Sequence, residues 1–445
     1  MSGAFVGERA VVIGLGVAGR AAARVLAEEG ADVRVSEARP DVGEPTDLRE
    51  LGIEVLGGGH EPGHLDGATL LVVSPGVPSS APVIAWARDR GLPVWGELEL
   101  GAHLVSAPCI AVTGTNGKTT TTGMIASVLL AAGVDAVACG NIGHPFAVAA
   151  REDRAALVVE CSSFQLEMQE SFHPRVSVLL NLAPDHLDWH SSFEAYAAAK
   201  AKVFARQDDG DTHIGNRDDG GAAAISRTAR CDVAWFTLDE PQDGETGYRG
   251  SELAARWGGV ELLGDRAVDT PAMRADAAAA AAASHAFGIG SQAIRDGLTA
   301  FTPEWHRGEI VAEVRGVRFV DNSKATNPHA ALAAADAAGG VVLIAGGDAK
   351  GVDLSPIGAL ADRLAGVVAI GASADEVVGI FQGRVPTRKA GSIEEAAHTA
   401  FELAPAGGSV LLAPACASWD MFRDYAERGD RFAAAALQIA REERT

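Results

Sequence analysis

A short glycine-bracketed segment, Ala111–Thr120, carries residues that could hold the phosphates of a nucleotide. The apolar run Cys109–Val112 predicts a buried strand before it, and Thr120–Leu130 predicts a helix after it. The turn would therefore lead into a helix N-terminus, where unpaired backbone N–H groups and the positive end of the helix dipole favour an anion. The segment predicts a phosphate-binding turn.

Two side chains of this turn indicate which phosphates it would hold. Lys118 could reach the terminal phosphates of a nucleotide, and the hydroxyl of Thr119 could hold a magnesium ion. The loop reads Gly-x-x-Gly-Lys-Thr and is shorter than the common phosphate loop, which has glycine where this chain has Val112. We predict nucleotide binding here rather than a chance glycine-rich turn.

Two later strands end near residues suited to the same chemistry. The apolar strand Ala156–Glu160 ends in a carboxylate, as does the strand that organises magnesium in phosphoryl-transfer proteins. The strand Val176–Leu180 leads to His186, which lies among carboxylates. Because strands and helices alternate here, we expect Lys118, Glu160 and His186 at one edge of a parallel sheet.

A second glycine-rich turn lies near the N-terminus. Gly14-x-Gly16-x-x-Gly19 follows the strand Ala10–Ile13 and opens a helix, and the next strand ends beside Glu37. This arrangement is typical of a Rossmann dinucleotide site, in which the acid binds a ribose. It is also typical of a Rossmann-like domain that holds another nucleotide or none, and the residues leave both interpretations open.

Three strands of the C-terminal part each end in a polar loop marked by glycine or proline. The strands are Val317–Val320, Val341–Ala345 and Ser409–Leu412. Ligands of α/β sheets gather beyond the carboxyl ends of the strands, so the repetition predicts a binding face in a third domain.

The alternation of strands and helices along the chain predicts an α/β fold. A length of 445 residues is typical of about three domains. We expect a Rossmann-like N-terminal domain at 1–96, a central mononucleotide-type α/β domain at 97–303 and a C-terminal Rossmann-like α/β domain at 304–445.

Composition argues against several classes of partner. The 37 basic and 59 acidic residues give a net charge of −22, which disfavours nucleic acid and anionic membranes. There is no apolar run of about 18 residues and no signal-peptide pattern, so we expect no membrane insertion. The five cysteines lack metal-ligand spacing and are typical of reduced thiols in a cytoplasmic protein.

Six motifs together resemble those of the Mur ligases, and the resemblance covers nearly the whole chain. The Ser-Lys-Ala-Thr-Asn and Ser-Ser-Phe-Gln stretches are the most specific of them. The motifs are Thr113–Thr120, Gly140–Gly143, Glu160–Leu166, Asp185–Asp188, Ser323–Asn327 and Pro414–Ser418.

The resemblance implies an activity and its partners. It implies an ATP-dependent carbon–nitrogen ligase that adds D-glutamate to UDP-N-acetylmuramoyl-L-alanine through an acyl phosphate, in cytoplasmic peptidoglycan precursor synthesis. It also implies two Mg²⁺ sites and a monomer, and it favours a uridine diphosphate over NAD at the N-terminal turn.

The resemblance also implies roles for individual residues. Catalytic roles fall to Lys118, Glu160, His186 and Lys200. Metal ligation falls to Thr119, Glu160, His186 and Lys200, with Lys200 carbamylated into a hard oxygen ligand. The residue types alone do not separate Lys200 from Lys202.

Ligand-binding roles are implied for three further sets. ATP would be held by Gly114, Thr115, Asn116, Gly117, Lys118, Thr119, Thr120, Asp276, His306, Arg307 and Asp321. The uridine diphosphate would be held by Gly14, Gly16, Val17, Ala18, Glu37, Arg39 and Gly76, and the muramoyl-alanine part by Asn141, Ser162, Gln165 and His186. D-Glutamate would be held by Lys324, Thr326, Lys350, Ser418 and Tyr425.

The chain departs from the family pattern in three places. The family often shows His-Asn-x-x-Asn where this chain has Ala272–Asp276, so Asp276 stands in for an adenine-side asparagine. Asn322 replaces a common acid, with Asp321 one residue earlier, and Tyr425 stands where phenylalanine is usual.

Three alternatives remain at this point. An NAD-dependent oxidoreductase would use Gly14–Gly19 and Glu37 but leaves the phosphate turn unexplained. A non-catalytic nucleotide switch would hydrolyse slowly without an amino acid. Within the ligases, another Mur ligase or a folylpolyglutamate synthetase would differ in its acceptor and amino acid.

Overall fold

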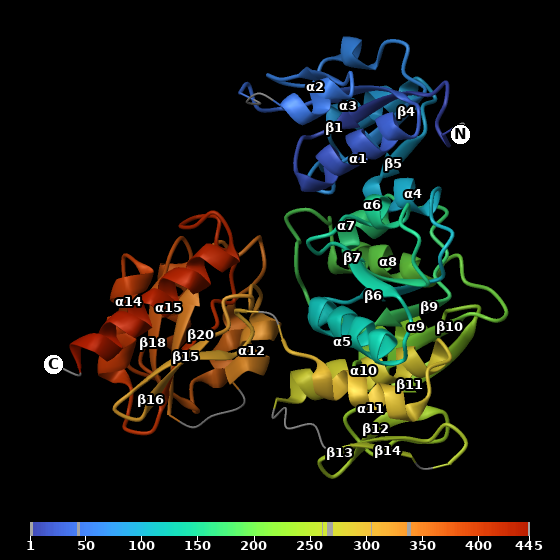
Figure 1. Cartoon of the computed structure of the whole chain (residues 1–445). Helices are drawn as coiled ribbons and strands as arrows, with labels where there is room; N and C mark the ends of the chain where they lie inside the picture. The colour runs from blue at the N-terminus through green and yellow to red at the C-terminus, as the bar shows by residue number, and fades with distance from the viewer. Residues whose placement is uncertain are drawn as a thin grey trace. The chain divides into compact units, whose positions relative to one another are not determined.

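The computed structural model describes residues 3–41, 45–259, 261–264, 270–303, 305–335 and 340–443 (Figure 1). Glu304, where we expected the third domain to begin, lies outside these residues. The chain divides into two compact units. Their bounds are Met1–Leu182, Ala197–Arg266 and Ala275–Phe301 for the first, and Ala183–Tyr196, Ala267–Arg274 and Thr302–Thr445 for the second.

The N-terminal part of the first unit is built on a five-stranded parallel sheet of order β3-β2-β1-β4-β5. Short Val-, Ile- and Leu-rich runs form these strands because helices cover both faces, and two separate core clusters lie against them. The strands are β1 Arg9–Ile13, β2 Asp32–Ser36, β3 Glu54–Leu56, β4 Leu70–Val73 and β5 Val94–Gly96, and the α-helices are α1 Val17–Glu28, α2 Thr46–Glu50 and α3 Pro82–Asp89.

The central part of the first unit carries a nine-stranded sheet of order β14-β13-β12-β11-β10-β9-β6-β8-β7. In this order, neighbouring strands from β12 through β6 to β7 are parallel. Strands β12, β13 and β14 pair in antiparallel fashion and extend the sheet. The strands are β6 Cys109–Thr113, β7 Ala136–Gly140, β8 Ala156–Glu160, β9 Val176–Leu179, β10 Thr212–Asn216, β11 Asp232–Phe236, β12 Glu245–Arg249, β13 Glu252–Ala255 and β14 Glu261–Gly264.

The helices of this central part follow the strands in the alternating order that the sequence predicts. The alanine-rich segment forms a helix whose alanines are buried, because small side chains allow close packing. The helices are α4 Glu97–Ala102, α5 Lys118–Ala131, α6 Phe146–Ala149, α7 Ser163–Glu167, α8 Phe193–Ala201, α9 Gly220–Ser226, α10 Pro271–Ala286 and α11 Ser291–Ala300.

The second unit is built on a six-stranded sheet of order β15-β16-β20-β17-β18-β19. Strands β15 and β16 form the hairpin that Arg315-Gly316 predicts, and the other pairs are parallel. Helix α12 lies on one side of this sheet and α14 and α15 on the other, each with its own core cluster (Figure 1). The elements are β15 Glu309–Val314, β16 Val317–Asp321, α12 Pro328–Ala335, β17 Val341–Gly346, β18 Leu364–Ile370, α13 Ala374–Phe381, β19 Thr387–Lys389, α14 Ile393–Leu403, β20 Ser409–Leu412 and α15 Tyr425–Glu442.

The prediction of an α/β fold is confirmed, with two corrections to helix ends. Helix α5 begins at Lys118 and not at Thr120, because Gly117 adopts the left-handed conformation that caps the helix. The sequence predicts a helix over Phe193–Phe204, but α8 ends at Ala201 and a 3₁₀ turn, Lys202–Phe204, takes the place of the last residues. None of the described helices is long and apolar enough to cross a membrane.

Candidate active site

The turn between β6 and α5 is shaped by two glycines with positive φ angles. Gly114 has a φ of +152° and Gly117 a φ of +85°. A Cβ atom on Gly117 would lie 2.1 Å from Oδ1 of Asp276, so only glycine fits beside this carboxylate. Oδ1 of Asp276 also accepts a hydrogen bond from the Thr121 hydroxyl at 3.2 Å. The structure therefore places Asp276 against the phosphate turn.

Asn181, two residues beyond the end of β9, fastens this turn and was missed in the sequence analysis. Its carbonyl oxygen accepts from Thr115 N–H at 3.0 Å, and its side-chain oxygen accepts from Asn116 N–H at 2.9 Å. Its amide Nδ2 donates to Asn116 O at 3.1 Å. A polar residue directly after an apolar strand was the available signal, and β9 lies next to β6 in the sheet.

Two lysines converge on the carbonyl oxygens of the turn. Lys118 Nζ donates to Gly114 O at 3.0 Å and to Thr115 O at 2.8 Å. Lys200 is 1 % exposed, and its Nζ donates to Gly114 O at 2.7 Å. Lys202 instead donates to Glu167 O at 2.6 Å. The structure thus distinguishes Lys200 from Lys202, which the residue types could not do.

Glu160 ends β8, directly beside β6, and its side chain is buried. Its Oε1 accepts from Asn141 Nδ2 at 2.9 Å, whereas its Oε2 is buried and has no hydrogen-bond partner in the described part of the chain. A buried anionic oxygen without a donor is costly unless a cation neutralises it. Together with the buried hydroxyl residue Thr119 at the start of α5, this oxygen fits a hard cation such as Mg²⁺.

Ser162 and Gln165 form a reciprocal cap at the start of α7. Gln165 N–H donates to Ser162 Oγ at 3.2 Å, and Gln165 Oε1 accepts from Ser162 N–H at 3.0 Å. Both residues are buried. The Ser-x-x-Gln pattern builds this turn because each side chain satisfies a backbone N–H that the helix leaves unpaired.

The N-terminal glycine turn is held by Glu37. Leu15 N–H donates to Glu37 Oε2 at 2.6 Å, and Arg39 donates from its backbone N–H at 3.0 Å and from Nε at 3.1 Å to Oε1. Burial raises the pKa of Glu37, but these hydrogen bonds and the Arg39 charge outweigh it and lower the pKa. The carboxylate therefore organises the turn while remaining ionised.

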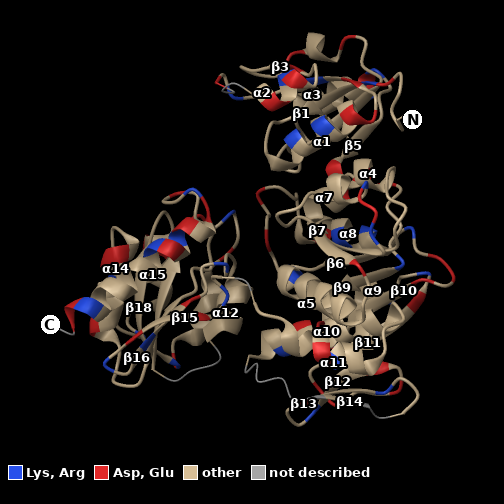
Figure 2. Ribbon diagram, viewed as in Figure 1, with Lys and Arg blue, Asp and Glu red and all other residues tan. Residues whose placement is uncertain are grey.

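A cavity of about 610 Å³ adjoins this turn. It is lined by Gly16, Val17 and Arg39, which belong to the predicted uridine diphosphate set, and by one face of α1. Its basic lining residues are Arg20, Arg24, Arg39, His144 and Arg151. The ribbon of α1 carries blue segments that mark Lys and Arg (Figure 2), within a chain whose net charge is −22. Glu28 also lines the cavity and pairs with Arg24 and Arg151, so the lining carries charges of both signs.

In the second unit, the three polar loops predicted at one sheet edge are joined by backbone hydrogen bonds. Ala415 N–H donates to Ala325 O at 2.9 Å, which links the loops after β20 and β16. Ala417 N–H donates to Asp348 O at 2.8 Å, which links the loops after β20 and β17. The strand order β16-β20-β17 explains this gathering, and the predicted common edge is confirmed.

Arg428 of α15 ties two of these loops together from inside and was not predicted. It is 1 % exposed, and its guanidinium donates to Ser323 Oγ at 3.0 Å, Ser323 O at 2.8 Å, Cys416 O at 3.2 Å and Ala417 O at 3.3 Å. Burial lowers the pKa of Arg428 to about 10. The neighbouring Tyr425 ring lies 3.6 Å below Lys324 Nζ.

His306 and Asp321, both predicted to serve ATP, pair with each other in the second unit. His306 Nδ1 lies 2.6 Å from Asp321 Oδ2, and both side chains are buried. A Cβ atom on Gly429 would lie 2.2 Å from His306 Nδ1, so α15 packs closely on this pair. Arg307 follows in the same loop and is half-buried.

Lys350, predicted to bind D-glutamate, forms a buried ion pair with Asp185. Asp185 also accepts from Asn327 Nδ2 at 3.1 Å, and its neighbour His186 has a φ of +53°. His186 belongs to the second unit, whereas Glu160 and Lys200 belong to the first. Thr326 is half-buried and Ser418 is buried in the joined loops.

Three family models match the chain in order. The Mur ligase MurD-like N-terminal domain matches residues 8–96, the Mur ligase middle domain 112–285 and the Mur ligase glutamate ligase domain 306–416.

The chain belongs to the Mur ligase family.

Curated relatives of this Mur ligase are similar over nearly their full length. The UDP-N-acetylmuramoylalanine--D-glutamate ligase of Frankia casuarinae is 45 % identical over 446 residues, which cover 97 % of this chain and 94 % of that protein. The protein of the same name from Streptomyces avermitilis is 42 % identical, with 96 % and 98 % covered.

Solved Mur ligase structures share the three-domain fold. The MurF ligase of Thermotoga maritima in complex with ADP aligns with a TM-score of 0.61 at 18 % identity, covering 99 % of this chain and 97 % of that one. The UDP-N-acetylmuramate-alanine ligase MurC of the same organism aligns with a TM-score of 0.61 at 19 % identity, covering 97 % and 99 %. The predicted three-domain α/β architecture is confirmed.

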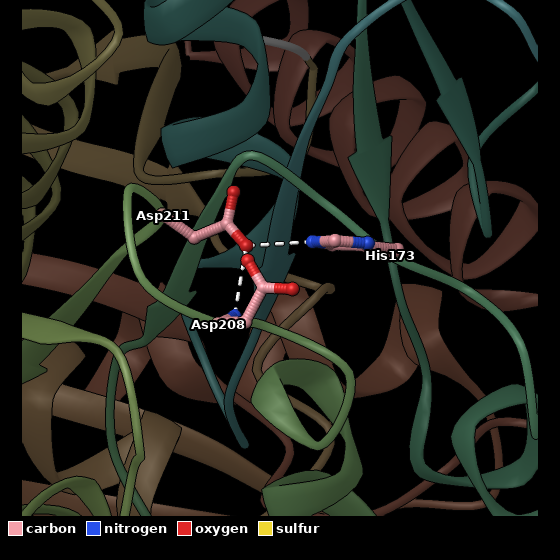
Figure 3. A group of neighbouring side chains, drawn as sticks. All are labelled: His173, Asp208 and Asp211. Carbon is pink, nitrogen blue, oxygen red and sulfur yellow. Dashed lines mark hydrogen bonds and ion pairs between the residues drawn. The ribbon is translucent and has the colours of Figure 1, made fainter.

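A separate cluster of possible metal ligands in this Mur ligase contains none of the predicted magnesium ligands. His173, Asp208 and Asp211 bring their ligand atoms within 4.8 Å of one another (Figure 3). His173 Nε2 lies 2.6 Å from Asp211 Oδ2, which also accepts from Asp208 N–H at 3.0 Å. These interactions stabilise the turn before β10, and we assign the cluster a structural role.

Proposed function

We propose that this Mur ligase adds D-glutamate to UDP-N-acetylmuramoyl-L-alanine with the hydrolysis of ATP to ADP and phosphate. The observation that carries the proposal is the full-length similarity, at 38–45 % identity, to curated relatives of that one name. We further propose that it acts as a monomer in the cytoplasm, within peptidoglycan precursor synthesis.

The reaction has two bond-forming steps. In the first, a carboxylate oxygen of the L-alanine residue attacks the γ-phosphorus of ATP, and the bond to the β,γ-bridging oxygen breaks to release ADP. In the second, the D-glutamate amine attacks the acyl carbon of the resulting acyl phosphate, phosphate leaves and the new amide nitrogen loses a proton. Both steps develop negative charge on oxygen, so positioned cations and N–H donors would lower both barriers.

The first unit supplies the phosphate site in this proposal. The backbone N–H groups at the start of α5 and the Lys118 ammonium would hold the β- and γ-phosphates. Thr119 and Glu160 would hold Mg²⁺, which neutralises phosphate charge when it is bound. The orphaned Oε2 of Glu160 supports this assignment. Gly114, Thr115, Asn116, Gly117 and Thr120 would shape the phosphate turn, with Asp276 beside it.

Lys200 has a distinct role in this proposal. We propose that CO₂ carbamylates its Nζ, so that a buried cation becomes an anionic oxygen donor for a second Mg²⁺, with His186 as another ligand. The burial of Lys200 at the carbonyl of Gly114 supports the idea, because it holds the Lys200 Nζ against the phosphate turn, where a metal ligand would be needed.

The acceptor and the amino acid would be held by different sets of residues. The uridine diphosphate set is Gly14, Gly16, Val17, Ala18, Glu37, Arg39 and Gly76, and the muramoyl-alanine set is Asn141, Ser162, Gln165 and His186. In the second unit, D-glutamate would be held by Lys324, Thr326, Lys350, Ser418 and Tyr425, and ATP by His306, Arg307 and Asp321. The cavity beside α1 and the joined C-terminal loops support these assignments.

The test is phosphate release from ATP and magnesium in the presence of UDP-N-acetylmuramoyl-L-alanine, while the amino acid is varied. We expect release that requires D-glutamate and is absent with L-glutamate, L-lysine or meso-diaminopimelate. Release that depends on another amino acid would assign a different Mur ligase activity. Slow release that ignores all amino acids would overturn the proposal in favour of a nucleotide switch.

A further inference from the structure

Helix α4 carries two buried glutamates, Glu97 and Glu99, with different partners. Glu97 is 1 % exposed and Glu99 is 2 % exposed. Glu99 accepts hydrogen bonds from Ser171 N–H at 2.9 Å and from the Ser171 hydroxyl at 2.6 Å, so it fastens the segment after α7. Glu97 instead hydrogen-bonds to α6 and to α7, whose first turn holds the proposed muramoyl-alanine residues Ser162 and Gln165.

Each oxygen of the Glu97 carboxylate accepts from one of these elements. Oε1 accepts from Ala147 N–H at 2.7 Å, in α6, which follows the Gly140–His144 turn that contains Asn141. Oε2 accepts from Gln165 Nε2 at 3.3 Å, in α7. One buried side chain therefore links α6 to α7.

The hydrogen-bond polarity at this link requires a carboxylate. Gln165 Oε1 is already committed to Ser162, since it accepts from Ser162 N–H at 3.0 Å and from Ser162 Oγ at 2.9 Å. Its Nε2 must therefore find an acceptor elsewhere, and Glu97 supplies it. A glutamine at position 97 has one accepting oxygen for the two donors, and its own NH₂ group would face the NH₂ group of Gln165.

We propose that Glu97 is a positioning residue for the acceptor substrate: it fixes the amide of Gln165, and through it the hydroxyl of Ser162, in the orientation that binds the muramoyl-alanine part. The inference rests on the proposed function, because it takes Ser162 and Gln165 as acceptor-binding residues. Glu97 itself is buried beneath them and acts through them.

The charges around Glu97 make its role depend on pH. Burial raises the pKa of Glu97 to about 7, while the Ala147 and Gln165 hydrogen bonds and the charge of His144 oppose that rise. Two buried thiols, Cys139 and Cys161, also face this carboxyl, and burial raises their pKa values so that they stay neutral. Near neutral pH, protonation of Glu97 would therefore weaken the hydrogen bond that its carboxylate accepts from Gln165.

The experiment compares equilibrium binding of UDP-N-acetylmuramoyl-L-alanine to the full-length chain and to four variants by calorimetry: Glu97→Gln, Glu99→Gln, Gln165→Glu and the double variant Glu97→Gln/Gln165→Glu. Glu97→Gln should raise the Kd at least about tenfold, as the loss of a charged hydrogen bond implies. Glu99→Gln, a buried carboxylate two residues away, should leave the Kd within about twofold. The KM for D-glutamate should stay unchanged in both.

A swapped pair supplies the sharpest readout. In Glu97→Gln/Gln165→Glu, the new amide at position 97 would donate from its NH₂ group to the new carboxylate at position 165. That carboxylate still accepts from Ser162, and the amide oxygen at position 97 would accept from Ala147. The hydrogen bonds with Ala147, with Ser162 and between positions 97 and 165 are then restored, so the double variant should bind the acceptor more tightly than either single variant. It also keeps the test open if Glu97→Gln alone does not fold.

The pH profile separates positioning from simple stabilisation. The acceptor Kd of the unmodified chain should rise as the pH falls through about 7. That rise should persist in Glu99→Gln and vanish in Glu97→Gln.

An unchanged Kd in Glu97→Gln, or a double variant weaker than both singles, would overturn the inference alone. Absence of acceptor binding by the unmodified chain would overturn both the inference and the proposed function. Acceptor binding without D-glutamate-dependent turnover would overturn the function while the Kd comparison still decides the role of Glu97.

Discussion

The ammonium of Lys350 and the carboxylate of Asp185 form an ion pair that is almost wholly buried, with side chains 3 % and 7 % exposed. They come from loops 165 residues apart in the sequence. Burial raises the pKa of Asp185, but the charges of Lys350 and His186 outweigh it and lower the pKa. The proposed glutamate-binding lysine is thus also a structural counterion.

Lys350→Met should destabilise the second unit. The substitution leaves the Asp185 carboxylate buried without its main counterion, which typically costs about 3–5 kcal/mol. Thermal unfolding would measure the loss. Lys389→Met is the matched control, because Lys389 pairs with Asp375 at exposed positions and such pairs contribute about 0–1 kcal/mol. Equal shifts in the two variants would contradict the buried-pair account.

Gly117→Ala should impair nucleotide binding. The new Cβ would lie 2.1 Å from Asp276 Oδ1, and the φ of +85° would be strained for alanine. Displacement of the turn should lower the affinity for ATP at least about tenfold. A fluorescent ATP analogue would measure the affinity.

Gly133→Ala provides the comparison for Gly117→Ala. Gly133 has a φ of +77° but no atom within 4 Å of an added Cβ, so it carries the strain without the clash. Its ATP affinity should stay unchanged. An equal loss of ATP affinity in Gly117→Ala and Gly133→Ala would contradict the clash as the cause.

The phosphate turn and the C-terminal loops could be predicted from sequence because their signals are local. A strand, a Gly-Lys-Thr turn and a helix follow one another within the segment 109–131, and neighbouring parallel strands bring their ends together. The exact start of α5 was missed because it depends on the left-handed conformation of Gly117, which one sequence does not reveal.

Glu97 and Arg428 could not be predicted, and Asn181 was signalled only by its place after a strand, because the partners of all three are remote in sequence. Asn181 and Asn116 are 65 residues apart, Glu97 and Gln165 are 68 apart, and Arg428 and Ser323 are 105 apart. An isolated charged residue in a helical pattern usually indicates a solvated face, so burial was the missing information. The roles of the substrate-binding residues came from the family resemblance and stay predictions.

Lys200→Ala should abolish most turnover while leaving the fold intact. Losing a residue that only supports a metal ligand typically costs up to about 100-fold. If Lys200 supplies a carbamate that is itself a ligand, its loss should lower kcat by at least that much. Short carboxylates such as formate or acetate should restore part of the activity, because they can place an oxygen in the vacated space. Lys202→Ala is the control, since Lys202 donates to Glu167 O instead, and it should keep near-normal turnover. A fully active Lys200→Ala would refute the carbamate.

Arg428→Met should weaken the binding of D-glutamate more than the binding of ATP or of the acceptor. The variant removes hydrogen bonds to Ser323, Cys416 and Ala417, which hold the two loops that carry Lys324 and Ser418. It also removes a buried positive charge from the loops that would hold the two carboxylates of D-glutamate, so the KM for D-glutamate should rise at least about tenfold.

The control for Arg428→Met lies one turn further along α15. Arg431 pairs with Glu394 at half-exposed positions, so Arg431→Met should leave the KM for D-glutamate within about twofold. Arg428→Lys keeps the charge but cannot reproduce the several donors of the guanidinium, and it should fall between the two. If Arg428→Met and Arg428→Lys raise the KM equally, geometry alone matters; if Arg428→Met leaves it unchanged, the two loops hold their positions without the guanidinium.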